Sequence, residues 1–283
     1  MFTWGFSRER GTAITGPVMG IVNVTPDSFS DGGRWFDADA ARAHGAALLA
    51  EGAAILDVGG ESTRPGAEPV SAEAEIARVV PVVAALAPHA VVSVDTSKAA
   101  VAEAAIAAGA RIVNDVSAGR QDPDMLRVVA AAGAGFIAMH MQGEPRTMQQ
   151  DPHYDDVVRE VVDHLRARCD AAVAAGIAPE SIMVDPGIGF GKTVEHNVAL
   201  LTHLETIVDR VGAPVLVGAS RKSFLGVLAG TGSDPGAREA ATIATTVWAL
   251  EHGAAMVRVH EVAASVRAAA VVEHLRSVAA VAA

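Results

Sequence analysis

The stretch VVSVDTSKAAVAEAAIAAGARIVN, residues 91–114, decides the fold class. It begins with a short β-branched run at Val91–Val94, continues with an alanine-rich stretch at 98–108, and ends with a second short run at Arg111–Asn114, whose central residues Ile112 and Val113 are β-branched and apolar. Continuous apolar runs are typical of parallel strands buried on both faces, and the stretch between them favours a crossover helix. The segment therefore predicts one strand–helix–strand unit of a parallel sheet.

The same alternation extends along the chain in both directions. Eight apolar runs are expected to be strands: Val18–Val24, Ala54–Val58, Val91–Val94, Arg111–Asn114, Gly135–Met139, Ser181–Val184, Val215–Gly218 and Met256–Val259. Helices are expected near 38–51, 71–86, 98–108, 122–132, 155–175, 194–209 and 236–252, and from about 261 to the end. Eight such units in 283 residues match an α/β fold, the (β/α)8 TIM barrel, with its active site at the carboxyl ends of the strands.

A doubly wound open sheet is the alternative architecture. Such a sheet usually carries a G-x-G-x-x-G turn after its first strand, whereas the run at Val18–Val24 is followed by Thr25 and Pro26. The barrel is therefore favoured. No linker of distinct composition divides the chain, so we expect a single domain over residues 1–283, with residues 1–16 as an unassigned lead-in.

Composition and charge exclude several classes of protein. Hydrophobic residues make up 51% of the chain and charged residues 19%, which excludes a disordered chain, and the lone Cys169 excludes a disulfide scaffold. The formal net charge of −11 argues against nucleic acid or an anionic membrane as a partner. Because the start of the chain lacks the apolar stretch of a secretory signal, we expect a cytoplasmic protein.

Polar residues follow every predicted strand, and in a barrel these positions converge on one face. They include Asn23, Asp57, Asp95, Asn114, His140, Asp185, Lys222, Arg258 and His260. Capping of the next helix would explain an Asp, Asn, Ser or Thr such as Thr96 or Ser97. It does not explain Lys222, Arg258 and His260, because cations are unfavourable at a helix N-terminus. These three residues favour an anion site.

The side-chain types at the strand ends indicate the chemical class of the ligand. Carboxylates and carboxamides together suit a ring with several N–H donors and carbonyl acceptors, such as a pteridine or purine, and nearby cations, Arg64 among them, suit a phosphate. Asn23 offers a hard amide oxygen to Mg²⁺. The sequence contains no Cys/His cluster with the spacing of zinc ligands, so a zinc site is not expected. Five histidines in helical or loop stretches are interpreted as surface residues, namely His44, His89, His164, His203 and His252.

Three loops stand out. Residues 186–193, PGIGFGKT, end like a Walker A loop, but Pro186 stands where that motif requires glycine. We expect this turn to bring backbone close to a flat ligand beside Asp185 and Phe190. Residues 25–33 and 59–66 are rich in glycine, proline and hydroxyl groups, and are expected to be mobile lids rather than ordinary turns.

Eight motifs fall in order at these strand ends: MGIVNVTPDSFSDGG (19–33), DVGGESTRPGA (57–67), SVDTSK (93–98), NDVS (114–117), MHMQGEPRTMQ (139–149), DPGIGFGKT (185–193), GASRKSFLG (218–226) and RVHEV (258–262). Through them the chain resembles the bacterial dihydropteroate synthases over about residues 18–272. The resemblance implies an enzyme that joins p-aminobenzoate to (7,8-dihydropterin-6-yl)methyl diphosphate. The products would be 7,8-dihydropteroate and pyrophosphate, in a step of folate synthesis.

The resemblance also implies roles for the matching residues. The expected pterin ligands are Asp95, Asn114, Asp185 and Lys222, and the expected diphosphate ligands are Thr63, Arg258 and His260. Arg64, Pro65, Phe190 and Ser223 are expected around p-aminobenzoate, and Asn23 as the Mg²⁺ ligand. The implied catalytic group is Asp95, Lys222, Arg258 and His260, and the implied mobile loop contains Thr25, Pro26, Asp27, Ser28, Phe29 and Asp31.

Two other functions stay open at this point. One is a related barrel that transfers a methyl group from methyltetrahydrofolate, which would share the pterin carboxylates but has no need of the SRKS segment at 220–223. The other is a paralogue without activity that binds pterin or stabilises a partner. A homodimer is expected from the family.

Overall fold

The computed structural model describes residues 3–5, 13–25, 38–63 and 66–282. Its eight parallel strands are β3 (Val18–Asn23), β4 (Ile55–Gly59), β5 (Val92–Asp95), β6 (Ile112–Asp115), β7 (Gly135–Met139), β8 (Ile182–Asp185), β9 (Leu216–Val217) and β10 (Met256–Val259). Every predicted strand is therefore present. The bounds agree with the expected ones to within one residue because the apolar runs end abruptly at polar residues.

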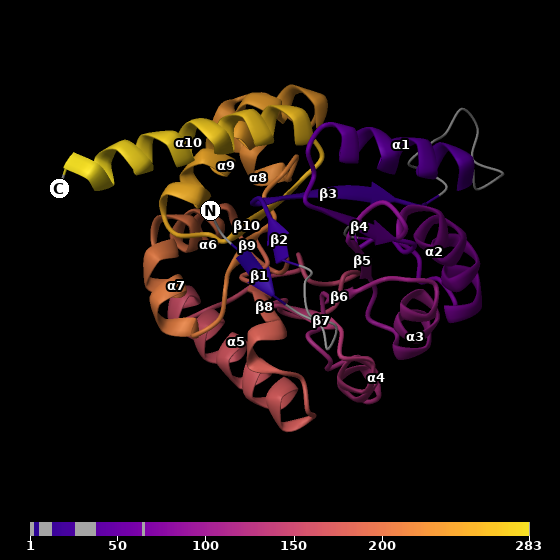
Figure 1. The fold of residues 1–283 in the computed structure, drawn as a ribbon. Coiled ribbons are helices and arrows are strands. Elements are labelled where there is room, and N and C mark those ends of the chain that lie inside the picture. The colour runs from indigo at the N-terminus through magenta and orange to yellow at the C-terminus, as the bar shows by residue number, and fades with distance from the viewer. Residues whose placement is uncertain (1–2, 6–12, 26–37, 64–65, 283) are drawn as a thin grey trace.

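These strands form a barrel. They pair in the order β8-β7-β6-β5-β4-β3-β10-β9, and a parallel bridge between Val184 and Val215 brings the two edges together. The helices surround the strands as an outer ring (Figure 1). The predicted (β/α)8 architecture is confirmed, and the open sheet is excluded.

The helices follow the expected alternation with two differences. They are α1 (Ala38–Ala50), α2 (Ala72–Leu86), α3 (Ala99–Ala107), α4 (Met125–Ala132), α5 (Val157–Ala174), α6 (Val194–Thr202), α7 (Leu204–Val211), α8 (Ser223–Ala229), α9 (Glu239–Glu251) and α10 (Val262–Ala282), with 3-10 turns η2 (Pro179–Ser181) and η3 (Gly236–Arg238). None of the described helices has the length and apolar character needed to cross a membrane.

The first difference is that the helix expected at 194–209 is two helices. The hydroxyl of Thr202 donates to the carbonyl of Val198 at 3.0 Å, and His203 leaves the helical conformation at φ −107 and ψ 26. Such bonding of a hydroxyl back to the preceding turn bends helices. The second difference is α8, a seven-residue helix that lies outside the expected ranges and is too short to show a helical period.

Two separate apolar layers hold the barrel together. One fills the interior with a side chain from most of the strands: Met19, Ile55, Ile112, Ile137, Met183, Leu216 and Met256. The other lies between the strands and the helices, and it includes Leu56, Val94 and Val113. Because alternate residues of a strand point to opposite faces, each strand supplies both layers.

A pair of short antiparallel strands lies at the amino-terminal end of the barrel. Strands β1 (Thr3–Gly5) and β2 (Ala13–Thr15) pair antiparallel, and β1 contacts η2, which directly precedes β8. Ile14 on this hairpin is buried and belongs to the interior layer. The two described strands of the lead-in thus lie at the amino-terminal end of the barrel, and the opposite end carries the polar residues.

Candidate active site

On four strands the inward-facing side chains change from apolar to polar toward the carboxyl end. On β4, β6 and β8 the apolar Ile55, Ile112 and Met183 are each followed two residues later by a buried polar residue, namely Asp57, Asn114 and Asp185. On β10, Met256 is followed in the same way by Arg258. The period of two places both members of each pair on the interior face. The carboxyl end of the barrel is therefore lined by a ring of polar side chains.

Asn114 and Arg258 join the carboxylates of this ring. Asn114 Nδ2 lies 3.1 Å from Asp57 Oδ2 and 3.3 Å from Asp95 Oδ1. Arg258 Nη1 lies 3.4 Å from the same oxygen of Asp57, and Nη2 lies 3.4 Å from Asp185 Oδ2. These five residues, which we call the carboxylate network, come from five different strands.

Burial shapes the charges within the carboxylate network. Burial, together with the neighbouring Asp57, raises the pKa of Asp95 to about 8. Burial alone would lower the pKa of Arg258, but Asp185 and Asp57 raise it. At neutral pH the network therefore combines a permanent cation with a carboxyl group that holds a proton. Such a site offers both a hydrogen-bond donor and several acceptors to a ring ligand.

Lys222 stands beside this network. Its ammonium donates to the carbonyl of Ile188 and lies 4.5 Å from the centre of the Phe190 ring. Burial lowers the pKa of Lys222 to about 7, while Asp185 opposes the shift. Lys222 thus links the carboxylate network to the loop that carries Phe190.

The glycine-rich loop 186–191 packs against the segment after β7. A Cβ on Gly187, whose φ is +67, would lie 1.8 Å from the carbonyl oxygen of His140, and one on Gly191 would lie 2.5 Å from that of Gln142. Both positions require glycine. We expected these glycines to admit a flat ligand, whereas two of them make room for neighbouring backbone.

A second polar group lies at the ends of β9 and β10. The hydroxyl of Ser220 lies 2.8 Å from His260 Nδ1 and 3.0 Å from Glu261 Oε2. Arg221, in the left-handed region at φ +59, forms an ion pair with Glu261. These contacts hold the imidazole of His260 at the rim, directly after the strand that carries Arg258.

A partly buried ion cluster supports the segment after β4. Lys98 Nζ lies 2.5 Å from Glu61 Oε2 and 2.6 Å from Glu75 Oε2. The other oxygen of Glu61 accepts the backbone N–H of Val70 at 2.9 Å. Glu61 therefore ties together both ends of the segment that contains Thr63.

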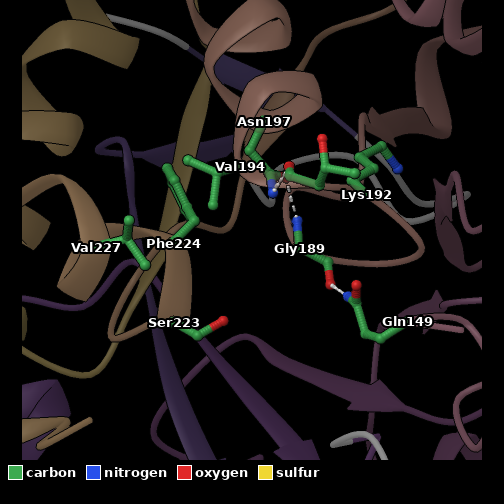
Figure 2. A pocket seen from close by; sticks show the side chains of 9 residues that line it. Gln149, Gly189, Lys192, Val194, Asn197, Ser223, Phe224 and Val227 are labelled. Atoms are coloured by element: carbon green, nitrogen blue, oxygen red, sulfur yellow. Dashed lines mark hydrogen bonds between the residues drawn. The ribbon is translucent and has the colours of Figure 1, made fainter. Parts of the chain in front are cut away.

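A pocket of about 210 Å³ lies beside the glycine-rich loop (Figure 2). Gly189 borders it and is held on both sides: its N–H donates to Asn197 Oδ1 at 2.6 Å, and its carbonyl accepts from Gln149 Nε2 at 2.6 Å. Phe224 supplies an apolar wall and Ser223 lies at the edge. The pocket combines an apolar surface with a few fixed polar groups, as small-molecule sites do.

Most residues predicted for the site lie at the carboxyl end of the barrel. Asp95, Asn114, Asp185 and Arg258 make direct contacts, and Lys222 and Phe190 form the adjoining pair. Asn23, Thr63, Ser223 and His260 lie at other strand ends or loops of the same face. Thr25 ends the described part of its loop, while Pro26, Asp27, Ser28, Phe29, Asp31, Arg64 and Pro65 lie outside the described residues.

The sequence-based choice of site residues left out Asp57 and Lys192. Asp57 touches both Asn114 and Arg258, and the register of β4 gives the signal that could have found it. It occupies the next inward position after Ile55. Lys192 carried no comparable signal, because its contacts depend on how two loops pack.

The interpretation of His164 as a surface residue was wrong. His164, on α5, is half-buried, and its ring packs edge-on against His140 with 4.7 Å between ring centres. Burial lowers the pKa of His164 to about 4. The helical periodicity of α5 could not show this, because the partner ring comes from the end of β7.

Comparisons with known proteins agree with this geometry. The model of the pterin-binding enzyme family matches residues 19–260. The dihydropteroate synthase of Mycobacterium leprae is 52% identical over 261 residues, covering 90% of this chain and 92% of the relative.

Two solved structures resemble the chain closely. One, the dihydropteroate synthase of Yersinia pestis with a sulfonamide drug complex, has a TM-score of 0.89 at 44% identity and covers 96% of this chain and 100% of its own. The other, that of Burkholderia cenocepacia complexed with 7,8-dihydropteroate, has a TM-score of 0.84 at 47% identity and covers 94% of this chain and 93% of its own.

Proposed function

The chain belongs to the dihydropteroate synthase family of pterin-binding enzymes, and we propose how its residues carry out the family reaction. It is a transferase of folate synthesis that joins p-aminobenzoate to (7,8-dihydropterin-6-yl)methyl diphosphate. The bond from the exocyclic methylene to the diphosphate breaks, a C–N bond to the arylamine forms, and pyrophosphate leaves. The arylamine nitrogen loses one proton in the process.

The carboxylate network is the proposed pterin site. The amino-pyrimidinone edge of a pterin presents adjacent N–H donors, which a carboxylate accepts with two oxygens. Asp185 is suited to this role because it is buried beside Arg258 and Lys222. Asp95 and Asn114 would take the remaining donors and acceptors of the ring. This network of five residues is the observation that carries the proposal.

The diphosphate would lie at the rim, near Thr63, Arg258 and His260. Pyrophosphate is a poor leaving group unless its charge is neutralised, and a guanidinium fixed in a dry site does this electrostatically. Arg258 is held by Asp57 and Asp185 before any anion arrives, so it needs little reorganisation. A dihydropterin ring delocalises positive charge from the methylene. We therefore propose a dissociative substitution in which the carboxylates of the network, notably Asp95 in its ionised form, stabilise the cation.

The residues around Asn23 are compatible with Mg²⁺. Asn23 ends β3 at the mouth of the barrel and provides a hard amide oxygen, and the described residues contain no cluster of three or more metal-binding side chains. Mg²⁺ commonly uses few protein ligands and binds mainly through phosphate oxygens. When bound there with the substrate, the ion would neutralise the charge on the diphosphate.

The p-aminobenzoate site is proposed between Phe190, Lys222 and Ser223, with Arg64 and Pro65 as further candidates. The arylamine is a weak nucleophile that is already unprotonated, so it needs orientation more than a base. Phe190 provides an apolar ring face beside the ammonium of Lys222. Ser223, at the edge of the adjoining pocket, offers a hydroxyl to the substrate carboxylate.

We also propose a homodimer that acts in the cytoplasm, with the whole chain as one domain. Apolar side chains are exposed on three successive helices, at Val227 and Leu228 on α8, Trp248 on α9, and Val271, Leu275 and Val278 on α10. Exposed apolar side chains on neighbouring helices support a contact between copies. Sedimentation of the wild type and of Leu275→Glu tests the dimer, and only a wild-type dimer that the substitution dissociates would support it.

A pyrophosphate-release assay with both substrates tests the function. Release that requires p-aminobenzoate and yields 7,8-dihydropteroate supports the proposal. Methyl transfer from methyltetrahydrofolate would instead favour the related methyltransferase barrel. Pterin binding without turnover would favour the inactive paralogue.

A further inference from the structure

The chain uses lysine in very few places. Of its 22 basic residues, only Lys98, Lys192 and Lys222 are lysines, and all three lie just beyond the carboxyl ends of strands. Lys98 pairs with two glutamates, and Lys222 belongs to the proposed site. Lys192 has no role in the reaction described above, yet it is only 3% exposed.

The contacts of Lys192 are made almost entirely to the two loops of this region. Its Nζ donates to the carbonyl of Phe190 at 3.0 Å and lies 2.9 Å from His140 Nδ1. Within the described part of the chain, it forms no ion pair. Burial and the nearby Lys222 lower its pKa well below the usual value. Because burying an amino group without a carboxylate is costly, these two contacts are the main interactions that offset the cost.

His140, the partner of Lys192, is held in place by contacts of both its backbone and its ring. Burial, together with Lys192, lowers its pKa to about 2, so the ring is neutral. In the tautomer that carries the proton on Nε2, its Nδ1 accepts a hydrogen bond from the amino group. Its backbone N–H donates to the carbonyl of Asp185 at 2.9 Å, and its own carbonyl lies against Gly187. The ring also packs against His164. His140 therefore gives Lys192 a rigid base at the end of β7.

The side chain of Lys192 points away from the pocket (Figure 2). It supports the loop from behind, whereas the Phe190 ring on the same loop faces Lys222. The loop is thus held at the Phe190 carbonyl by Lys192, and at Gly189 by Asn197 and Gln149.

We infer that Lys192 and His140 are positioning residues that fix the Phe190 ring against Lys222 for p-aminobenzoate, without touching either substrate. This inference rests on the proposed function. The carboxylate network shares only one of these contacts, the backbone hydrogen bond from His140 to Asp185, which side-chain substitutions leave in place, so the effect falls mainly on the aminobenzoate side. Loss of the pair changes the KM for p-aminobenzoate more than kcat or the KM for the pterin diphosphate.

The experiment compares Lys192→Met with the pair His140→Leu and His140→Asn in the full-length enzyme. Methionine keeps the length of the side chain without the donor, leucine removes the acceptor, and the asparagine oxygen retains an acceptor at the position of Nδ1. Arg127→Met, at an exposed cation on α4, is the control. Steady-state kinetics are measured for each substrate at saturation of the other, with thermal unfolding of every variant.

We expect Lys192→Met to raise the KM for p-aminobenzoate about tenfold. The kcat and the KM for the pterin diphosphate should stay within about twofold of the wild-type values. His140→Leu shows the same split, His140→Asn restores wild-type values, and the control changes nothing. An unchanged KM for p-aminobenzoate, or an equal rise in both KM values, overturns the inference. If Lys192→Met does not fold, the comparison of His140→Leu with His140→Asn decides by the same criteria.

A second measurement separates this inference from the proposed function. In protein labelled with ¹³C at lysine Cε, only three side-chain signals are present, and Lys192→Met identifies one of them. His140→Leu must shift that signal, while His140→Asn must leave it in place. If the wild type releases no pyrophosphate, the proposed function is refuted. If the Lys192 signal keeps its position in His140→Leu, the inference that Lys192 and His140 act together as positioning residues is refuted.

Discussion

The two ends of the barrel are built from the same strands with opposite chemistry. At the amino-terminal end, side chains such as Met19, Ile112 and Met256 fill the interior, and Ile14 seals it. At the carboxyl end, Asn114 and Arg258 occupy the next inward positions. On the strands of Asn114 and Arg258, two residues, or roughly 7 Å, separate the apolar side chain from the next inward-facing polar side chain.

This short separation divides two tasks. Burying polar and charged groups is costly unless they are paired, and the carboxylate network is only partly paired, with 3.4 Å contacts from Arg258 to Asp57 and Asp185. The apolar layer at the other end stabilises the strands that carry this network. Substitutions at the two ends should therefore affect different properties, and the following predictions test that division.

The largest effect is expected for Arg258→Ala. It leaves Asp57 and Asp185 without their shared cation, and it removes the proposed partner of the diphosphate. Pyrophosphate release should fall about 10³-fold. The affinity for a pterin that lacks the diphosphate, measured by calorimetry, should fall much less. Equal losses for both ligands would contradict the diphosphate role.

Asp185→Asn should have the next largest effect. Asparagine replaces a two-oxygen acceptor with a mixed group that cannot match adjacent N–H donors, so pterin affinity should fall about 100-fold. Calorimetry with the pterin diphosphate measures this loss. Unchanged pterin affinity would exclude Asp185 from the pterin site.

Ile112→Ala tests the opposite end. Removing a fully buried interior side chain should lower the free energy of unfolding by about 2–5 kcal/mol, measured by urea denaturation. Well below the unfolding temperature, kcat and both KM values should stay within about twofold. A large loss of activity in a folded variant would show that the two ends are coupled.

A smaller and pH-dependent effect is expected for Asp95→Asn. The pKa of Asp95 is about 8 in the folded chain and its ordinary value is 3.8. The folded state therefore retains a proton that the unfolded state loses, and this group reduces stability progressively between these two values. The gain in melting temperature of the variant over the wild type should be small at pH 4 and should reach several degrees, about 3 to 5 °C, at pH 9. A gain that shrinks with rising pH would contradict the raised pKa.

The smallest effect is expected for Ile14→Val on the hairpin. One buried methylene is lost, which should cost about 0.5–1.5 kcal/mol of unfolding free energy and leave activity unchanged. Chemical denaturation measures this difference. A loss of pterin binding in this variant would contradict a purely structural role of the hairpin.

Sequence patterns predicted the strands well, and local interactions explain why. Runs such as Val91–Val94 are apolar and β-branched, and they end at charged residues, so both type and bounds follow from the sequence. The break between α6 and α7 at His203 was missed because it depends on hydroxyl bonding within one turn. The start of α3 was predicted to within one residue, but its distant partner was not: Asp122, 23 residues away, accepts the N–H of Ala99.

The order of apolar and polar residues by itself determined an eight-unit barrel with a polar carboxyl end, because hydrophobic periodicity and strand direction are properties of the chain. Only the tertiary structure decided which polar groups touch: Asp57 with Asn114 and Arg258, and Lys192 with His140. These contacts join strands and loops far apart in sequence. Their distances, and the pKa shifts that burial produces, depend on how the barrel closes.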